Sequence, residues 1–461
     1  MVLRQYYLGC LAQASYLVAD ERSGHAAIID PRRDVDVYLE DLRRLGLTLD
    51  DVFLTHFHAD FVSGHLELRE RTGCRIRLGA RAEADYAFVP VRDGEIIDLG
   101  SVRLEILETP GHTPEAISIV VKDMAAGGER PAAVLTGDAL FVGDVGRPDL
   151  FVARGASADS LARELYRSLW SKLLALPDET LVYPGHGAGS MCGKNLGPET
   201  FSTIGRQRQE NYALQPMPED DFVRLITADQ PEAPAYFAHD ASFNRSERET
   251  LPQVLERSLN ALGLEEALEL HAAGAQVLDV REPPVFAAGH LQGSINIGLS
   301  GKYATWAGTL VARERPIVVV AEPGWEHEAV MRLGRIGFDA VRGYLAGGIA
   351  ALEPRPELLA ALPRLTVPEL AELLASSDPP TVLDVRTQGE RDTGGIPGSV
   401  HLPLHQLVRR AAEVPRVDDL VVICGSGYRS TIAASLLLRD GGAGISDVIG
   451  GMAAWDARAA R

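Results

Sequence analysis

Short apolar runs that end in polar or glycine turns recur along the first half of the chain. Each run carries His or Asp at or just after its last apolar residue: "AAIIDP", "DVFLTHFH", "SVRLEILETPGH", "AAVLTGDAL" and "TLVYPGH". This pattern predicts the β-strands of a layered α/β domain whose chemistry lies at the strand ends. The stretch "SADSLARELYRSLWSKLLALP" has helical spacing and a Ser-Asp start instead, so it predicts a helix.

The second half of the chain contains an internal repeat. One copy has "VLDVREPPVFAAGHLQGSINIGL" from Val277, and the other has "VLDVRTQGERDTGGIPGSVHLPL" from Val382. Further on, "PIVVVAEPGW" matches "DLVVICGSGY", and "AGGIAAL" matches "IGGMAAW". Copies of this length predict two small α/β domains, because solenoid units are only ~20–50 residues long. We therefore expect an α/β multidomain protein with domains at residues 1–245, 246–360 and 361–461.

Composition and charge narrow the class of protein. Of the 461 residues, 46% are apolar and 24% are charged, as in a soluble globular protein. The net charge of −19 argues against nucleic acid as a partner. No segment approaches the ~20 apolar residues of a membrane span, so no membrane partner is expected. The four cysteines form no CxxC pair, which argues against a disulfide framework and a thiolate zinc site and favours the cytoplasm.

The stretch "THFHADFVSGH" places potential metal ligands at alternate positions. His56, His58 and Asp60 can face one cavity, because side chains two apart on an extended segment point the same way. A lone histidine is more often a packed or surface residue than a ligand. Here, however, several glycine-rich strand exits each end in a further donor, namely His112, Asp138 and His186. Together these donors indicate a metal site.

Taken in order, "THFHADFVSGH", "TPGHTP", "TGDALF" and "YPGHG" resemble the metallo-β-lactamase superfamily over roughly residues 1–240. The resemblance implies an αββα fold, and glyoxalase II enzymes and persulfide dioxygenases share most of these motifs. Hydrolases of the group hold two metals, the second partly through a His directly after the motif's Asp. Phe61 stands at that place here, so one donor is lost and an apolar ring replaces it. One metal, not two, is therefore expected.

The resemblance to persulfide dioxygenases also implies the identity of the metal and its ligands. These enzymes hold a single Fe(II), and matching their motifs implies one Fe(II) per chain on His56, His112 and Asp138. Two imidazoles and one carboxylate leave the opposite face of an ion open, which suits a substrate sulfur and O₂ side by side. The ligands would be oriented by groups behind them, namely His58, Asp60 and His186. The alternative is that these three groups bind a second ion after all.

Two further residues of the first domain have two interpretations each. Arg147 lies nine residues after Asp138, where the dioxygenase family has an arginine near the substrate. Its guanidinium could bind a carboxylate of the thiol carrier, or it could form a surface salt bridge. Cys192 is either a pocket thiol that accepts sulfur or an inert packing residue.

The stretch "VVICGSGYRS" indicates a second kind of site. Cys424 follows an apolar strand and precedes "STIAASLLLRD", which predicts a helix. The glycines of the loop let successive N–H groups point inward, and such a nest at a helix N-terminus stabilises the negative charge of a bound persulfide. Arg429 adds a cation at the rim. We expect a sulfur anion to be bound by the loop residues Gly425, Ser426, Gly427 and Tyr428.

With "LDVR" and "GSVHLP" upstream, this segment resembles the rhodanese family over residues 364–461. The loop from Cys424 through Arg429 has six residues, the length found in sulfurtransferases, whereas related phosphatases have longer loops. The resemblance implies that Cys424 is the catalytic nucleophile, which carries a sulfane sulfur as a covalent persulfide, and that Arg429 assists it.

The first copy of the repeat, about residues 262–355, departs from this pattern. Its aligned loop has Ala321 opposite Cys424 and Glu326 opposite Arg429. A persulfide cannot form on alanine, and the anion of Glu326 would repel a sulfur anion. The sequence therefore predicts a catalytically silent domain that spaces, docks or dimerises.

The three domains together indicate sulfane-sulfur chemistry. The first domain is expected to oxidise a low-molecular-weight thiol persulfide with O₂ to sulfite, and the last to move sulfur between persulfide and sulfite or thiosulfate. Fusion raises the local concentration of the shared intermediate. Because the superfamily often dimerises, a homo-oligomer (dimer or tetramer) is expected. The alternatives are a two-zinc thioester hydrolase of the glyoxalase II kind, and a rhodanese tandem that binds sulfur or a partner without turnover.

Overall fold

The computed structural model describes residues 1–150 and 157–459 and divides the chain into two compact units. The first unit comprises Met1–Leu251 together with Arg335–Gly337, and the second comprises Pro252–Gly334 and Phe338–Arg461. The main stretch of the first unit thus ends close to the predicted boundary at residue 245. The predicted boundary at residue 360 lies inside the second unit.

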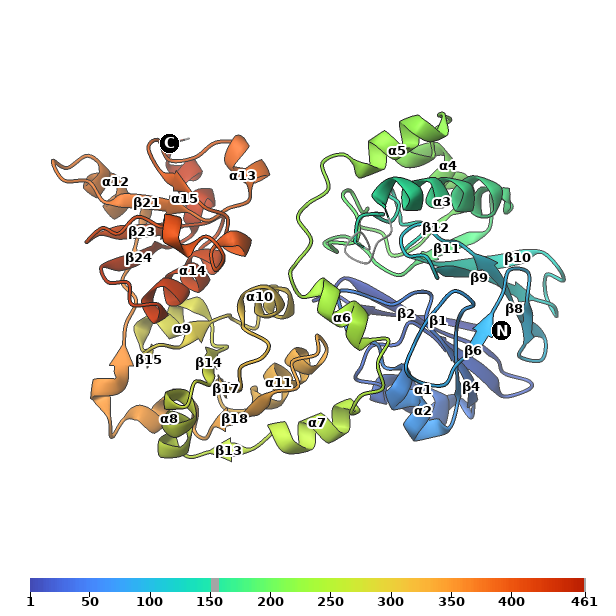
Figure 1. Cartoon of the computed structure of the whole chain (residues 1–461), viewed down its shortest axis with the longest axis horizontal. Helices are drawn as coiled ribbons and strands as arrows, with labels where there is room; N and C mark the ends of the chain where they lie inside the picture. Colours follow the sequence, from blue (N-terminus) through green and yellow to red (C-terminus); the bar gives the residue numbers. More distant parts are fainter. Residues whose placement is uncertain (151–156, 460–461) are drawn as a thin grey trace. The chain divides into compact units, whose positions relative to one another are not determined.

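The first unit contains two six-stranded sheets (Figure 1). One sheet has the order β1-β2-β3-β4-β5-β6, with strands at Val2–Leu8, Gln13–Asp20, His25–Ile29, Thr48–Phe53, Arg75–Gly79 and Val89–Val91. The other has the order β12-β11-β10-β9-β8-β7, with strands, from β7 to β12, at Ile96–Asp98, Val102–Glu108, Ile117–Asp123, Pro131–Gly137, Leu181–Pro184 and Ser202–Thr203. Every apolar run quoted above for the first domain contributes one of these strands.

An apolar core lies between the two sheets and helices cover their outer faces. Tyr16 and Ile29 of the first sheet belong to one buried cluster with Leu104, Ile119 and Leu135 of the second. The first sheet packs its other face on α1 (Asp36–Leu45) and α2 (His65–Thr72), and the second packs on α3 (Ala158–Ser171), α4 (Ile204–Glu210) and α5 (Glu219–Thr227). This four-layer arrangement confirms the predicted αββα fold.

The helix predicted after residue 156 forms as α3. The side chain of Ser157 accepts a hydrogen bond from the backbone N–H of Ser160, which satisfies one of the free donors at the helix start. Leu161, Leu165 and Leu169 recur every four residues, so they share one face, and all three are buried. The chain leaves this domain through α6 (Phe237–Phe243) and α7 (Leu251–Ser258).

The second unit contains two five-stranded parallel sheets with the same topology. The first copy has the order β13-β18-β17-β14-β16, with strands at Ala261–Leu262, Val341–Leu345, Ile317–Val320, Gln276–Asp279 and Ile295–Asn296. The second copy has the order β20-β24-β23-β21-β22, with strands at Arg364–Leu365, Ile445–Val448, Leu420–Ile423, Thr381–Asp384 and Val400–His401. A short antiparallel pair joins β15 (His290–Leu291) to β19 (Leu359–Ala360). The repeat therefore folds as two small α/β domains, as predicted.

Helices flank both parallel sheets. Those of the first copy are α8 (Leu264–Ala272), α9 (Pro283–Ala288), α10 (Tyr303–Leu310) and α11 (Glu326–Gly334). Those of the second copy are α12 (Val367–Leu374), α13 (Gln388–Asp392), α14 (Tyr428–Arg439) and α15 (Gly451–Ala459). The central strands β17, "IVVV", and β23, "LVVI", are buried at every position, as expected for strands covered on both faces.

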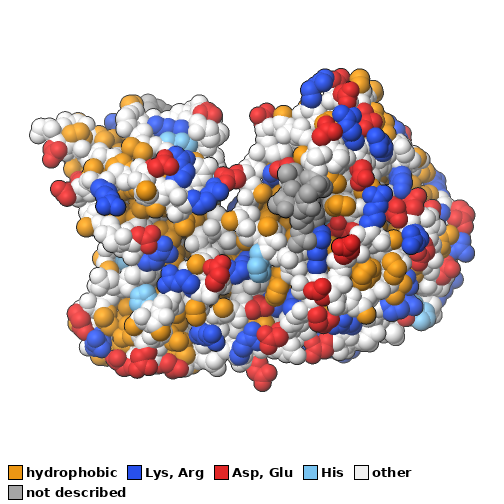
Figure 2. Space-filling model, viewed as in Figure 1, with side chains coloured by type: hydrophobic (Ala, Val, Ile, Leu, Met, Phe, Trp, Pro, Cys, Tyr) orange, Lys and Arg blue, Asp and Glu red, His pale blue; other side chains and the backbone are white. Residues whose placement is uncertain are grey.

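The surface carries mixed charges. On the face shown in Figure 2, Asp and Glu side chains are interspersed with Lys and Arg side chains. Pairs one helical turn apart, such as Arg163 with Asp159 and Arg206 with Glu210, contribute to this mixing. Among the described residues, no helix combines the length and the apolar character needed to cross a lipid bilayer.

Candidate functional site

Three predicted ligands from three strand ends meet in one buried cluster. His56 follows β4, His112 follows β8 and Asp138 follows β10. Asp138 Oδ2 lies 3.7 Å from His56 Nε2 and 3.5 Å from His112 Nε2, and all three side chains are buried. One ligand atom from each residue lies within 4.8 Å of the other two, so a single ion could contact all three.

Each imidazole of the cluster is held through its far nitrogen. His112 Nδ1 donates to the carbonyl oxygen of Arg147 at 2.8 Å, which leaves Nε2 as the free acceptor facing Asp138. His56 Nδ1 lies 2.9 Å from Thr55 Oγ1, and this hydroxyl donates in turn to Asp30 Oδ2 at 2.8 Å. Metal-ligating histidines are commonly oriented in this way.

The protonation states of the cluster also fit a metal ion. Burial lowers the pKa of both His56 and His112, so the two imidazoles are neutral. Burial disfavours the charge on Asp138, but His186 and His56 outweigh it and hold the pKa of Asp138 below its ordinary value. Neutral imidazoles and an ionised carboxylate are the forms that coordinate a metal.

The predicted orienting group His186 links two carboxylates. Its Nδ1 lies 2.8 Å from Asp138 Oδ1, and its Nε2 lies 2.8 Å from Asp60 Oδ2. Burial opposes a charge on this imidazole, yet Asp138 and Asp60 outweigh burial and raise the pKa of His186 well above its ordinary value. The resulting imidazolium fixes the orientation of the Asp138 carboxylate.

Phe61 lies against the second group of potential ligands. Its ring centroid is 4.4 Å from that of His58 and 6.4 Å from that of His186, and the ring is buried. An apolar ring at this position offers no ligand and disfavours a nearby charge. One donor atom each from His58, Asp60 and His186 also lies within 4.8 Å of the other two, so a second ion is the alternative that metal analysis has to test.

Glycines allow the close approach of backbone and ligand in this cluster. Gly137 has φ +50°, and a Cβ there would lie 2.5 Å from Thr55 Oγ1. A Cβ at Gly185 would lie 2.6 Å from Asp138 Oδ1. The glycines of "TGD" and "PGH" are therefore steric requirements of the site.

Two supporting residues were missed by sequence reasoning. Asp30 is buried at φ +50°, and its Oδ1 accepts the backbone N–H of Thr55 at 2.7 Å and lies 3.0 Å from His58 Nε2. Its position at the end of "AAIIDP" was a signal that could have found it. Asn244, at the end of α6, donates to the carbonyl oxygens of His58 and Phe61, both at 2.8 Å. No sequence signal marks this residue, because its partners lie 186 and 183 positions away.

Replacing Asn244 with Ala is expected to loosen the loop that carries His58 and Phe61. The variant loses both donated bonds and the acceptor of the backbone N–H of Ser63, a bond of 2.8 Å. We expect a loss of about 1–3 kcal/mol in the free energy of unfolding and a fall of about 10–100-fold in metal affinity. Thermal unfolding and a competitive metal titration measure the two effects. Asn260→Ala is the control, since Asn260 is exposed and its side-chain amide donates to the carbonyl oxygen of Arg257. Equal effects of the two variants on metal affinity would contradict the role assigned to Asn244.

Arg147 is buried and engaged by the protein. Its Nε and Nη2 donate to the two carboxylate oxygens of Asp149 at 2.8 and 2.7 Å. Its Nη1 also donates to the carbonyl of Met191 at 3.1 Å, and its Nη2 to the carbonyl of Pro231 at 2.6 Å. A salt bridge therefore forms, although not at the surface, and the predicted contact with a substrate carboxylate stays a prediction. In this structure Arg147 ties three segments together while its backbone oxygen holds His112.

Cys192 lies at the edge of the metal cluster. Its sulfur forms a potential ligand group with Asp138 and His186, and the side chain is 2% exposed. Burial, followed by the charges of Asp60 and Asp138, raises the pKa of this thiol well above its ordinary value. Cys192 is thus a buried, protonated thiol beside Asp138 and His186.

The loop after β23 brings a backbone donor to the sulfur of Cys424. The side chain is fully buried, the backbone N–H of Gly427 donates to Sγ at 3.1 Å, and Ser430 Oγ lies 3.6 Å from Sγ. Gly427 has φ +95°, a left-handed conformation that turns the chain into α14. The loop therefore presents one backbone donor to the sulfur at the start of a helix, and the binding of a sulfur anion by several N–H groups stays a prediction.

Two residues of this loop make contacts that the sequence did not reveal. Arg429 forms a two-pronged ion pair with Glu390, with N–O distances of 2.7 and 2.6 Å. Tyr428 Oη donates to the carbonyl oxygen of Gly298 in the first copy at 2.6 Å. The hydroxyl of Tyr428 is thus hydrogen-bonded to the neighbouring domain. The predicted contact of Tyr428 with a sulfur anion can therefore involve only the backbone N–H of this residue.

The matching loop of the first copy keeps the backbone but lacks the nucleophile. Ala321 follows β17 and is buried, and Glu326 Oε2 accepts the backbone N–H of Gly324 at 2.7 Å. A Cβ at Gly348 would lie 2.6 Å from the carbonyl oxygen of Ala321, just as a Cβ at Gly451 would lie 2.3 Å from that of Cys424. The two strand ends are therefore packed alike, and this loop has no sulfur at the position of Cys424.

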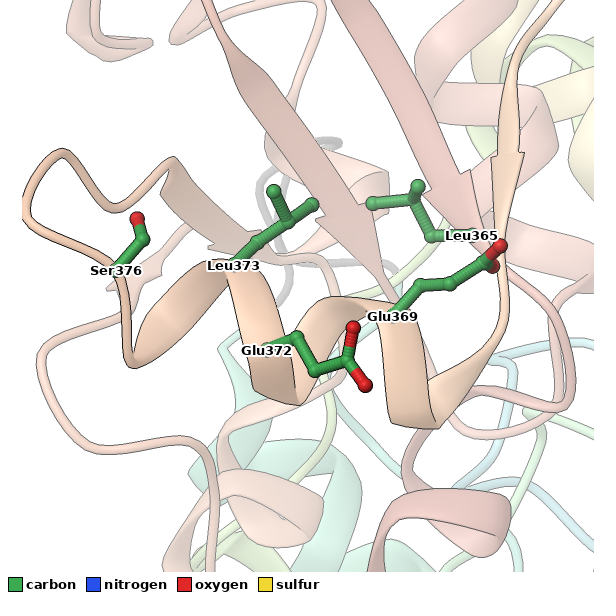
Figure 3. A pocket seen from close by; sticks show the side chains of 5 residues that line it. All are labelled: Leu365, Glu369, Glu372, Leu373 and Ser376. Atoms are coloured by element: carbon green, nitrogen blue, oxygen red, sulfur yellow. The ribbon is translucent and has the colours of Figure 1, made fainter.

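A surface depression of about 340 Å³ lies on α12 (Figure 3). Its lining residues are Leu365, Glu369, Glu372, Leu373 and Ser376. None of these belongs to the metal cluster or to the thiol loop, residues 424–429. The depression therefore adds nothing to either candidate site.

An αββα domain with a buried histidine–aspartate cluster defines a class of metal-binding proteins, here joined to two α/β domains of which one has a thiol loop. Comparison with known families agrees with this description. The model of the "Metallo-beta-lactamase superfamily" matches residues 8–186, and that of the "Rhodanese-like domain" matches residues 264–353 and 366–458. The chain belongs to the metallo-beta-lactamase superfamily, in a fusion of a domain homologous to ETHE1 persulfide dioxygenases with two rhodanese-like domains.

Individual relatives cover different parts of the chain. The chain is 30% identical over 230 residues to "Persulfide dioxygenase ETHE1, mitochondrial" of Homo sapiens, which corresponds to 49% of this chain and 80% of that protein. It is 29% identical over 243 residues to the "Beta-lactamase hydrolase-like protein" of Agrobacterium fabrum, of which it spans about half, 52%. A crystal structure of a metallo-beta-lactamase from Staphylococcus aureus is similar with a TM-score of 0.67 and 30% identity, over 75% of this chain and 98% of that one.

Proposed function

We propose that the first domain is an Fe(II) persulfide dioxygenase. The reaction consumes a thiol persulfide, O₂ and water, and yields the free thiol and sulfite: RSSH + O₂ + H₂O → RSH + SO₃²⁻ + 2 H⁺. The observation that carries the proposal is the buried triad of His56, His112 and Asp138 beside the apolar ring of Phe61. The relatives named as persulfide dioxygenases, about 30% identical over half of the chain, support it.

The roles of the residues follow from their contacts. His56, His112 and Asp138 would hold one ion, and Fe(II) bound there supplies open coordination positions for a substrate sulfur and O₂. The imidazolium of His186 keeps the Asp138 carboxylate in place. Phe61 excludes a second ion from the neighbouring group of ligands.

We further propose that the last domain transfers sulfane sulfur through Cys424. The thiolate attacks the outer sulfur of a persulfide, the S–S bond of the donor breaks, and the donor leaves as a thiolate: RSSH + Cys–S⁻ → RS⁻ + Cys–S–SH. Sulfite then accepts the sulfur to give thiosulfate, or the reverse reaction loads Cys424 from thiosulfate. The contact of Sγ with the Gly427 N–H supports this role. Its substrates are small molecules, and a cytoplasmic location and a homo-oligomer stay predictions.

An oxygen-electrode experiment tests the first proposal. Full-length protein loaded with iron is given persulfides of glutathione and coenzyme A in turn, and O₂ uptake, sulfite and iron content are measured. We expect equimolar O₂ uptake and sulfite formation with at least one of them, and one iron per chain. Two zinc ions per chain, thioesterase turnover and no O₂ uptake would contradict the proposal.

The second candidate function is the two-zinc thioester hydrolase. The convergence of His58, Asp60 and His186 on one point favours it, because those residues could hold another ion. The position of Phe61 opposes it, because a charged ion there would contact an apolar ring. The metal content measured above separates the two candidates.

A further inference from the structure

The cation predicted at the rim of the thiol loop is accompanied by a carboxylate. Both nitrogens at the end of Arg429 donate to Glu390, Nη1 to Oε2 and Nη2 to Oε1. The hydrogen bond to Arg429 is the main cause that lowers the pKa of Glu390 to about 2. Glu390 is therefore ionised at neutral pH, and it offsets the charge that a sulfur anion would meet at Arg429.

This carboxylate lies beside Gly425, the residue that follows the nucleophile. A Cβ at Gly425, the residue after Cys424, would be 2.9 Å from Arg429 Nη2 and 3.5 Å from Glu390 Oε1. A substrate group that approaches the Cys424 sulfur along this side of the loop meets both members of the pair. The remaining attraction for an anion comes from the backbone, such as the Gly427 N–H.

The internal repeat shows that the pair accompanies the nucleophile. Glu390 is the fourth residue after "LDVR" in the second copy, and the equivalent residue of the first copy is Val285. The residue equivalent to Arg429 is Glu326. The copy that lacks the cysteine thus lacks both members of the ion pair.

Helix capping accounts for only part of the geometry of Glu390. Its Oε2 accepts the backbone N–H and the hydroxyl of Thr387 at 3.0 and 2.9 Å, which completes a capping box at the start of α13. Glutamine serves equally well in such a box. The cap does not use Oε1, which contacts Arg429 at 2.6 Å. The negative charge of Glu390 therefore acts on Arg429 through an oxygen that the helix cap does not use.

We propose that Glu390 sets the charge selectivity of the Cys424 loop, favouring donors with at most one negative charge at the reacting sulfur group over dianions such as thiosulfate. The proposal rests on the proposed sulfur transfer at Cys424. A persulfide loads Cys424 by the step given above. Thiosulfate loads it by S₂O₃²⁻ + Cys–S⁻ → SO₃²⁻ + Cys–S–S⁻, in which the S–S bond of thiosulfate breaks and sulfite leaves. This second route brings two negative charges next to Glu390.

The variant Glu390→Gln tests the proposal in the full-length chain. Glutamine keeps the capping box and the size of the side chain but removes the charge. We expect the KM for thiosulfate to fall roughly fivefold, and that for an organic persulfide to change less than about twofold, because a fixed charge acts more strongly on a dianion. Glu369→Gln is the matched control, since Glu369 forms the same capping box with Thr366 on α12.

The possible outcomes separate this inference from the function on which it rests. An unchanged or higher KM for thiosulfate, or an equal change for both donors, contradicts the role of Glu390. If the unmodified chain transfers sulfur from neither donor, the proposed sulfurtransferase function itself is wrong. A change in Glu369→Gln equal to that in Glu390→Gln would assign the effect to helix capping and overturn the inference.

Discussion

Replacing Asp138 with Asn is expected to remove metal binding and O₂ uptake together. Asp138 is the carboxylate of the triad, and its Oδ2 lies 3.7 and 3.5 Å from the two imidazoles. Asparagine keeps the shape but removes the charge that balances a divalent ion. Persulfide-dependent O₂ uptake should fall by more than about a hundredfold, because the loss of a residue that merely supports a ligand already costs 10–100-fold. Metal content after desalting and oxygen-electrode rates measure the two effects.

A second buried aspartate provides the control for this variant. Asp51 of β4 is buried like Asp138 and forms ion pairs with Arg75 and Arg77, each at 2.8 Å. Asp51→Asn should lower the melting temperature but leave one metal per chain, since this carboxylate has no contact with the triad. If Asp138→Asn keeps its metal and its O₂ uptake, the assignment of the triad is wrong.

The placement of the predicted ligands at strand ends follows from the strand pattern, whereas the choice of this triad came from the resemblance to persulfide dioxygenases. Each apolar run of the first domain becomes a strand, and the turns that carry His56, His112 and Asp138 follow three of these strands. Alternation along "THFHAD" grouped His56 with His58 and Asp60, whereas the structure places His58 and Asp60 with His186 in a separate group. Local patterns of this kind survive in the fold because burial of the apolar runs decides the position of the turns.

Contacts between distant segments could not be predicted in this way. Asn244 contacts His58 because α6 brings it there, although the two residues are 186 positions apart in the sequence. Glu390 pairs with Arg429 from 39 positions earlier in the chain. The sequence left open whether Arg147 binds a substrate carboxylate or forms a surface salt bridge, whereas the fold buries it in an ion pair with Asp149. Such pairings depend on how the elements pack, and periodicity carries no information on that.

Replacing Cys424 with Ser is expected to abolish sulfur transfer from thiosulfate to a thiol. A serine hydroxyl cannot form the S–S bond that carries the sulfane sulfur, although it fits the space and can still accept the Gly427 N–H. Release of sulfite from thiosulfate in the presence of a thiol measures the loss. Cys74→Ser is the control, because Cys74 is also buried and burial raises its pKa to about 11, so it should contribute nothing to transfer.

The same variant separates the two proposed activities. With a preformed persulfide, Cys424→Ser should consume O₂ at the rate of the unmodified protein, because the triad is intact. With thiosulfate and a thiol as the only sulfur source, O₂ uptake should stop, because Cys424 is the route by which sulfur reaches the thiol to form a persulfide. Thiosulfate-dependent O₂ uptake that persists in the variant would show that sulfur reaches the first domain without Cys424, and the proposed coupling would then be wrong.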